Sequence, residues 1–90
     1  MNVNYDDVIV FNTLAGGYYC LAVGRVSEYT FDSHLEVEHH KVFHSFNSPY
    51  KDKVVHCSHR VGYNDIKKVI PEKYLKNPSA IIADYPELLI

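Results

Sequence analysis

The chain has 90 residues, of which 47% are hydrophobic and 22% are charged, and its formal net charge is −2. These values are typical of a globular domain, so they exclude a chain that is disordered by composition. The length predicts a single domain, residues 1–90, with a core of modest size.

The start of the chain and its cysteines bear on where the protein works. Residues 1–7 lack the basic start and apolar run of a secretory signal, and no apolar run reaches the roughly 18 residues of a membrane-spanning helix. Two cysteines, Cys20 and Cys57, do not form the pattern of a disulfide framework. We therefore expect a cytoplasmic protein with reduced thiols and no membrane partner.

The first third of the chain reads as two strands. The β-branched run at residues 8–11 is typical of a buried strand, and Gly16-Gly17 breaks the chain after it. Residues 18–31 then read as a long strand in which Gly24 predicts a bulge or a sharp bend. Asp32-Ser33 supplies turn residues.

Residues 34–46 fit two structures. Leu35, Val37 and His39 alternate with polar residues, as in a strand, and the segment is rich in Val, Phe and His, which are mediocre helix formers. A helix also fits, because Ser33 and Glu36 would form a capping box at its start. We favour the strand and keep the helix as the alternative.

The second half begins with a turn at residues 47–52 and a strand at residues 53–61. Asn64 predicts the cap of a helical turn that contains Ile66, Val69 and Ile70. Pro71 interrupts that turn and starts a second one through Leu75. The apolar tail after it consists of Ile81, Ile82, Leu88, Leu89 and Ile90.

This order of elements resembles the small SH3-like β-barrels of the Tudor type. The resemblance rests on an apolar strand after Asp6-Asp7, on Gly24-Arg25-Val26 followed after a turn by residues 35–38, and on a strand leading into a helical turn at residues 61–70. It implies a mainly β fold, either a small SH3-like barrel or a β-meander, over residues 6–71. A C-terminal helical turn and apolar tail occupy residues 72–90. The alternative is an α+β fold, with the order β-hairpin, helix, strand, helix, in which residues 34–46 are helical.

Metal binding is one candidate chemistry, because all six histidines lie between residues 34 and 59. If residues 34–46 form a strand, a hairpin brings its end opposite residues 55–60. Zinc needs three or four nitrogen or sulfur ligands that converge at about 2.0–2.3 Å. The candidate ligands of a zinc site are His40, His44, Cys57 and His59. No cofactor other than zinc is indicated.

Catalysis by a cysteine nucleophile is not expected. Cys57 and His59 point the same way on a strand, but their Cα atoms would be about 6.6 Å apart. An acid that could orient the imidazole is not evident in the sequence. We therefore predict that the protein is not an enzyme.

Nucleic-acid or nucleotide binding is a second candidate, carried by residues 50–73. Tyrosine rings stack on bases, and lysine and arginine side chains hold phosphate groups. The residues of this surface would be Arg60, Tyr63, Lys67, Lys68 and Lys73, with Tyr50, Lys51 and Lys53 on the preceding turn.

Protein binding is the third candidate and the one that we favour. Tyr18 and Tyr19 lie beside the glycine pair, and tyrosine is enriched at protein interfaces. The apolar tail could also dock on a partner or on a second copy of the chain, which would give a homo-oligomer.

The sequence therefore predicts a small, non-enzymatic binding or adaptor module that acts through protein–protein contact. Its abundance of Asn, Lys, Ile and Tyr resembles that of accessory or inhibitor proteins of bacteriophages. Nucleic-acid or nucleotide binding through residues 50–73 and zinc binding by the His/Cys window are the alternatives.

Overall fold

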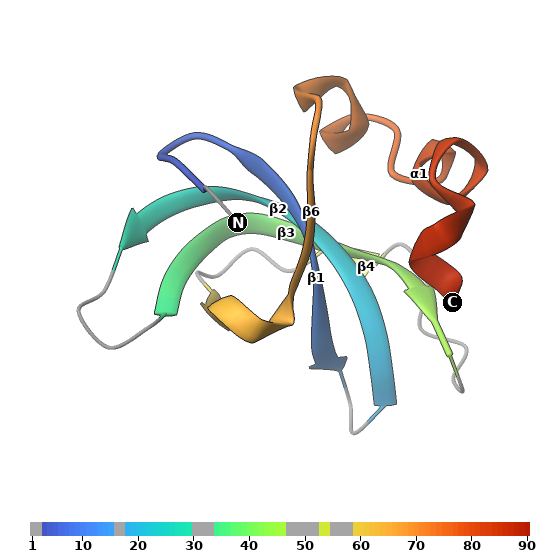
Figure 1. Cartoon of the computed structure of the whole chain (residues 1–90), viewed down its shortest axis with the longest axis horizontal. Coiled ribbons are helices and arrows are strands. Elements are labelled where there is room, and N and C mark those ends of the chain that lie inside the picture. Colours follow the sequence, from blue (N-terminus) through green and yellow to red (C-terminus); the bar gives the residue numbers. More distant parts are fainter. Residues whose placement is uncertain (1–2, 16–17, 30–33, 47–52, 55–58) are drawn as a thin grey trace.

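A computed structural model of the chain describes residues 3–15, 18–29, 34–46, 53–54 and 59–90. Within these ranges the chain folds into strands, short 3₁₀ helices and one short α-helix (Figure 1). In chain order they are β1 (Val8–Ala15), β2 (Tyr18–Tyr29), β3 (His34–Ser45), β4 (Lys53–Val54), β5 (His59–Gly62), η1 (Tyr63–Asp65), β6 (Ile66–Ile70), η2 (Glu72–Leu75), α1 (Ala80–Asp84) and η3 (Pro86–Leu89).

The strands of the described residues form one antiparallel sheet in the order β4-β3-β2-β1-β6, with β5 also paired to β3. The sheet is strongly curved, but it is not closed into a barrel (Figure 1). The prediction of a mainly β fold is confirmed. β1, β2 and β3 follow one another as in a β-meander, whereas β6 returns to pair with β1 and β5 pairs with β3.

Residues 34–45 form strand β3, so the helical alternative for residues 34–46 is wrong. β3 pairs with β2 along one edge and with β4 and β5 along the other. Leu35 and Val37 are buried in the core, as the alternating pattern predicts for a strand, and the irregular register beyond Glu38 brings Val42 into the same core. Pairing along both edges and this burial outweigh the local capping signal at Ser33 and Glu36.

Gly24 lies at a break in the β2–β3 register, where Val23 pairs with Lys41 but Arg25 pairs with Glu38. A Cβ atom at Gly24 would come within 2.9 Å of Val37 Cγ1 on β3. The chain therefore needs glycine here, because the two strands approach more closely than a side chain allows. The predicted irregularity at Gly24 is confirmed.

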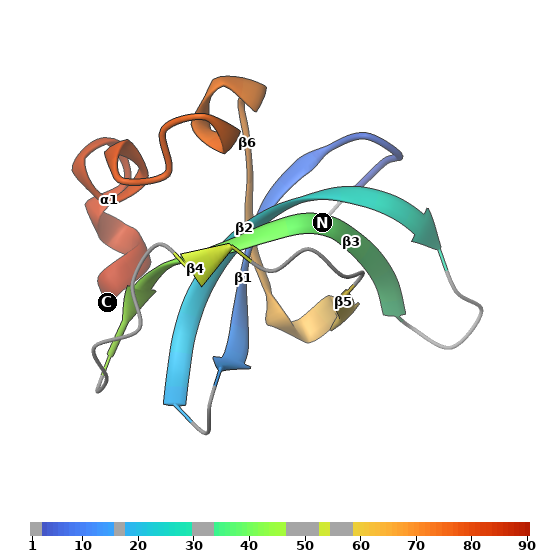
Figure 2. The ribbon, with the colours of Figure 1, turned by 180° about the vertical axis from the view of Figure 1, so that it is seen from behind.

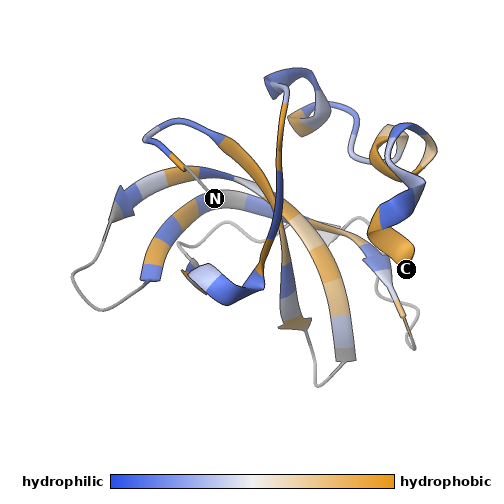
Figure 3. Cartoon of the chain, in the orientation of Figure 1, coloured by the Kyte–Doolittle hydropathy of each residue, from blue (hydrophilic) through white to orange (hydrophobic). Residues whose placement is uncertain are grey.

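The sheet buries residues on both of its faces, so its central strands carry consecutive buried apolar residues, at 8–11 in β1 and 20–23 in β2 (Figure 3). In β1, Ile9 and Phe11 point to one face, while Val8 and Val10 point to the other. The first face forms the β5 core, which contains Val3, Ile9, Phe11, Cys20, Ala22, Val26, Leu35, Val37, Val42, Val61 and Ile66. The second forms the C-terminal core, which contains Val8, Val10, Leu21, Val23, Phe43, Ile70, Tyr74, Ile81 and Leu88.

The helical turn predicted over residues 66–70 is wrong, because these residues form strand β6. β6 pairs with β1, and three of its five residues are β-branched, which favours a strand. The helical turn lies just before it, in η1, at residues 63–65. The second predicted turn is confirmed, since η2 begins directly after Pro71.

Residues 71–90, the C-terminal segment, cover the second face of the sheet (Figure 2). Ile81 of α1 and Leu88 of η3 are buried there, whereas Leu89 and Ile90 are exposed. The apolar tail therefore docks in part on its own sheet. Among the described residues, no helix is long and apolar enough to cross a membrane.

Candidate functional site

A pocket of about 320 Å³ opens where β1 ends. This volume lies at the small end of the range for ligand sites, roughly 300–1,000 Å³. Its lining comes from two regions that are far apart in the sequence, namely β1 with β2 and β5 with η1. The lining residues are Asn12, Thr13, Leu14, Tyr19, Arg60, Val61 and Asp65.

The register of the sheet explains how these residues meet. Leu14 is the direct cross-strand partner of Tyr19, so both side chains leave the sheet on the same face. Asp65 directly precedes Ile66, which pairs with Phe11, and η1 therefore lies beside the last part of β1. Arg60 belongs to β5, which pairs with β3, and the curvature of the sheet brings it opposite β1.

Large apolar side chains are exposed at this end of the sheet. Tyr19 is 66% exposed and Leu14 is 62% exposed. Phe46 lies beside them, since its backbone N–H donates a 3.1 Å hydrogen bond to the Tyr19 carbonyl, and it is 49% exposed. His44 packs edge-on against Phe46, with ring centroids 4.9 Å apart. Exposed apolar groups gathered in one place are typical of an interaction site.

The polar residues of the pocket are of mixed chemistry. Arg60 supplies a guanidinium group and Asp65 a carboxylate, and both residues are exposed. Asn12 and Thr13 are partly buried and add an amide and a hydroxyl group. A neutral mixture of hydrogen-bonding and aromatic groups of this kind suits a polar organic or peptide ligand better than a polyanion.

Two of the residues predicted for binding meet in this pocket, namely Tyr19 and Arg60. Tyr63 is exposed in η1, close to Asp65 in the chain. Tyr18 pairs through its backbone with Ala15, and Tyr50 lies outside the described residues. The sequence had assigned Tyr19 and Arg60 to different hypotheses, whereas the fold places them in one site.

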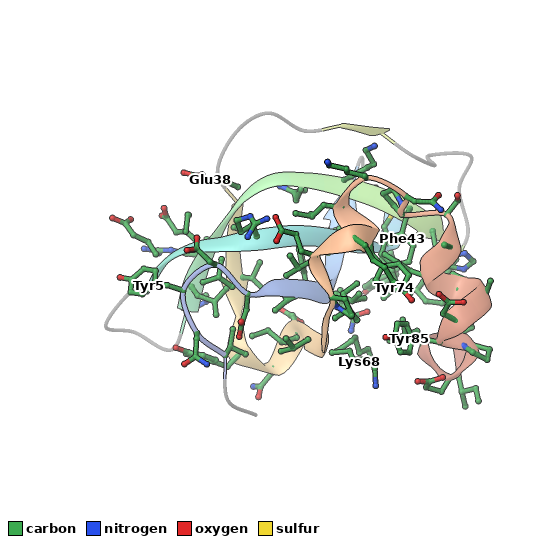
Figure 4. All side chains as sticks on the ribbon, turned by 90° about the horizontal axis from the view of Figure 1, so that it is seen from above. Tyr5, Glu38, Phe43, Lys68, Tyr74 and Tyr85 are labelled. Carbon is green, nitrogen blue, oxygen red and sulfur yellow. The ribbon has the colours of Figure 1, made fainter. Side chains whose placement is uncertain are left out.

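The lysines predicted for nucleic-acid binding lie elsewhere. Lys68 has its Nζ 3.8 Å from Glu87 Oε1 and 5.0 Å from the centre of the Tyr85 ring. Lys67 is exposed on β6. In Figure 4, Lys68 lies next to Tyr85 of the C-terminal segment. Lys68 therefore helps to hold this segment and does not line the pocket with Arg60.

The predicted zinc ligands are only partly within the described residues. His40 is buried and lies edge-on to Phe11, with ring centroids 6.0 Å apart, whereas His44 contacts Phe46. His59 pairs through its backbone with Val37, and Cys57 lies outside the described ranges. Within the part of the chain that the structure describes, no three His, Cys, Asp or Glu residues are placed to hold a metal ion.

A second pocket, of about 330 Å³, lies within the C-terminal segment and is lined in part by Lys73, Tyr74 and Asp84. The Tyr74 hydroxyl donates a hydrogen bond to the Asp84 carboxylate. This hydrogen bond, together with burial, raises the pKa of Tyr74 above its ordinary value. Tyr74 also packs against Tyr85 and belongs to the C-terminal core, so this site has a structural role (Figure 4).

Sequence reasoning missed most of the pocket lining, namely Asn12, Thr13, Leu14, Val61 and Asp65. A signal for Leu14 existed, because a hairpin with its turn at Gly16-Gly17 pairs residues 14 and 19. The contribution of Asp65 had no such signal, since it depends on β6 being a strand.

Comparison with protein families, with characterised proteins and with solved structures finds no match to this chain.

Proposed function

We propose that the chain is a non-enzymatic binding module that recognises a protein partner in the cytoplasm, using the pocket at the end of β1. The observation that carries the proposal is the meeting of Tyr19 and Arg60 in one pocket beside the exposed side chain of Leu14. Tyrosine and arginine are the residues that most often dominate the energy of protein interfaces.

The electrostatics favour a protein partner over nucleic acid. The pocket wall carries the carboxylate of Asp65 as well as the guanidinium of Arg60, and the chain as a whole has a net charge of −2. Lys68 lies near the carboxylate of Glu87. A nucleic-acid surface needs several cations that follow the phosphate backbone, and these residues supply little net positive charge.

Site-specific photo-crosslinking tests this proposal directly. A photoreactive phenylalanine is placed at position 19, in the pocket, and in a matched variant at position 5. Tyr5 is exposed to a similar degree, 58%, and it lies near the opposite end of β2, because the neighbouring Asp6 N–H binds the Val26 carbonyl. Both proteins are irradiated in lysate of the source cell, and the covalent products are identified by mass spectrometry.

We expect position 19 to capture one specific protein and position 5 to capture little of it. Adding Arg60→Glu to the position-19 variant should reduce the yield of the crosslinked product, because a negative charge replaces the positive charge of Arg60 in the pocket lining. Equal products from positions 5 and 19, or a yield that is unaffected by Arg60→Glu, would contradict the proposal.

A further inference from the structure

We propose that the partner binds by strand addition: an extended segment of it pairs with the edge of β1 at Leu14, inside the pocket. This inference rests on the proposed function and names the form and the chemistry of the partner segment. It is carried by the backbone of β1, by the position of β6 and by the charges of Arg60 and Asp65 in the pocket lining.

The backbone of β1 presents hydrogen-bonding groups toward the pocket. In an antiparallel sheet, alternate residues direct their N–H and C=O groups to opposite neighbours. Ala15 and Tyr18 flank a connection of two residues, so they form a hydrogen-bonded pair, and Thr13 and Cys20 form the next one. Leu14 therefore directs both of its backbone groups away from β2, and the carbonyl of Asn12 points the same way.

The strand on that side of β1 ends before it reaches these groups, and η1, which continues beside β1, forms no strand ladder with it in the described part of the chain. Among the described strands, β6 lies along this edge, and its register with β1 runs from Val8 to Phe11 only. Leu14 lies three residues beyond the last paired position. Figure 1 shows the end of β1 extending past β6. A free strand edge is a template for another extended segment.

The pocket lies along this same edge, which gives the added strand space and side-chain contacts. Leu14 and Tyr19 contribute an apolar and an aromatic side chain to its lining, and Arg60 and Asp65 contribute a cation and a carboxylate. We therefore expect the segment to carry an apolar or aromatic side chain against Leu14 and Tyr19. An acidic side chain faces Arg60, and a basic or hydroxyl-bearing side chain faces Asp65, so that the charges of the two partners are complementary.

The test selects a peptide and then asks how it binds. A phage-displayed library of random eight-residue peptides is selected on the wild-type protein in the presence of excess Leu14→Pro variant. Proline removes the Leu14 N–H, which points away from β2, so the β1–β2 ladder loses no hydrogen bond. Leu14→Val is the matched control, because it keeps both the N–H and an apolar side chain. The amide spectra of both variants show whether they are folded.

We expect the selected peptide to bind Leu14→Pro about tenfold more weakly than wild type and Leu14→Val within about twofold, as the loss of one backbone hydrogen bond predicts. In the wild-type protein, bound peptide should slow the hydrogen exchange of the Leu14 amide about tenfold or more. The Thr13 amide, which already faces β2, should not change. The exchange measurement keeps the test valid if Leu14→Pro does not fold.

Charge reversal tests the chemistry of the segment. Arg60→Glu should weaken the binding of the selected peptide about tenfold. A second peptide, in which lysine replaces the acidic residue, should bind the Arg60→Glu protein about as tightly as the selected peptide binds wild type.

Three results would overturn the inference. The first is the absence of any peptide that prefers wild type over Leu14→Pro, and the second is bound peptide without slower exchange at Leu14. The third is self-association in sedimentation that Leu14→Pro abolishes, which would make the occupant a second copy of this chain. If the first or second result is obtained but position 19 still crosslinks to its specific partner, only strand addition is excluded. The proposed function then stands.

Discussion

Gly24 shows how one residue sets the geometry of the sheet. Its missing side chain allows β3 to approach β2, because an added Cβ would meet Val37 Cγ1 at 2.9 Å and His40 Cβ at 3.1 Å. We expect Gly24→Ala to lower the free energy of unfolding by about 1–3 kcal/mol, as for other overpacked cores. Urea denaturation followed by circular dichroism measures this change.

Gly62 provides the matched control for that prediction. Its φ is −73°, and an added Cβ would lie 3.4 Å from the nearest atom, Asp65 Oδ2. Gly62→Ala should therefore change the stability by no more than about 0.5 kcal/mol. Equal losses in the two variants would show that the close approach at Gly24 is not the cause.

The Tyr74–Asp84 hydrogen bond predicts an effect of pH. The folded protein raises the pKa of Tyr74 above the unfolded value of about 10, chiefly through the hydrogen bond to Asp84. The contribution of the Tyr74 hydroxyl to the free energy of unfolding is therefore fully present below pH 10. This contribution is lost as the pH rises above 10. The wild type should exceed Tyr74→Phe in free energy of unfolding at pH 9, and this advantage should shrink by pH 11. An advantage that grows over this interval in urea denaturation would exclude the assigned role of the hydroxyl.

Among the elements, the C-terminal segment depends on a few buried anchors. Ile81 is fully buried in the C-terminal core, whereas Leu89 is 40% exposed. Ile81→Ala should cost about 2–5 kcal/mol of stability, because it leaves a cavity between α1 and the sheet. Leu89→Ala removes a side chain of similar size and should cost much less. Urea denaturation of both variants compares them, and similar losses would mean that α1 does not anchor the segment.

Local sequence signals predicted the strands well where the apolar pattern was clear, as in the continuous run Val8–Phe11 and the long strand that contains Gly24. They were ambiguous at residues 34–46, where a capping box competed with alternation, and β3 follows the alternation because both of its edges are paired. They were wrong at residues 66–70. Asn64 does not cap a helix but lies inside η1, whose N-cap is Gly62, and pairing with β1 decides the structure of the residues that follow.

For the molecule as a whole, the two cores should unfold together. β1 and β2 contribute alternate residues to both, so neither core can be lost without breaking the strands that hold the other. We expect a single two-state transition, with coincident curves from circular dichroism and tyrosine fluorescence. Separate transitions, with the C-terminal segment melting first, would contradict this shared architecture.

The candidate site is a property of the whole fold. Tyr19 was predicted from its place beside the glycine pair and Arg60 from the basic stretch, and each was assigned to a different partner. Only the curvature of the sheet and the pairing of β6 with β1 bring them together with Asp65. Contacts of this kind join residues about 40 positions apart, and local patterns do not contain them.

The most direct test of the central claim is a map of amide chemical-shift changes when the captured partner is added to the isotope-labelled protein. We predict that the largest changes fall on residues 12–14, on Tyr19 and on Arg60, Val61 and Asp65. Changes concentrated on Lys67, Lys73 and the C-terminal segment, with the pocket unaffected, would contradict the account.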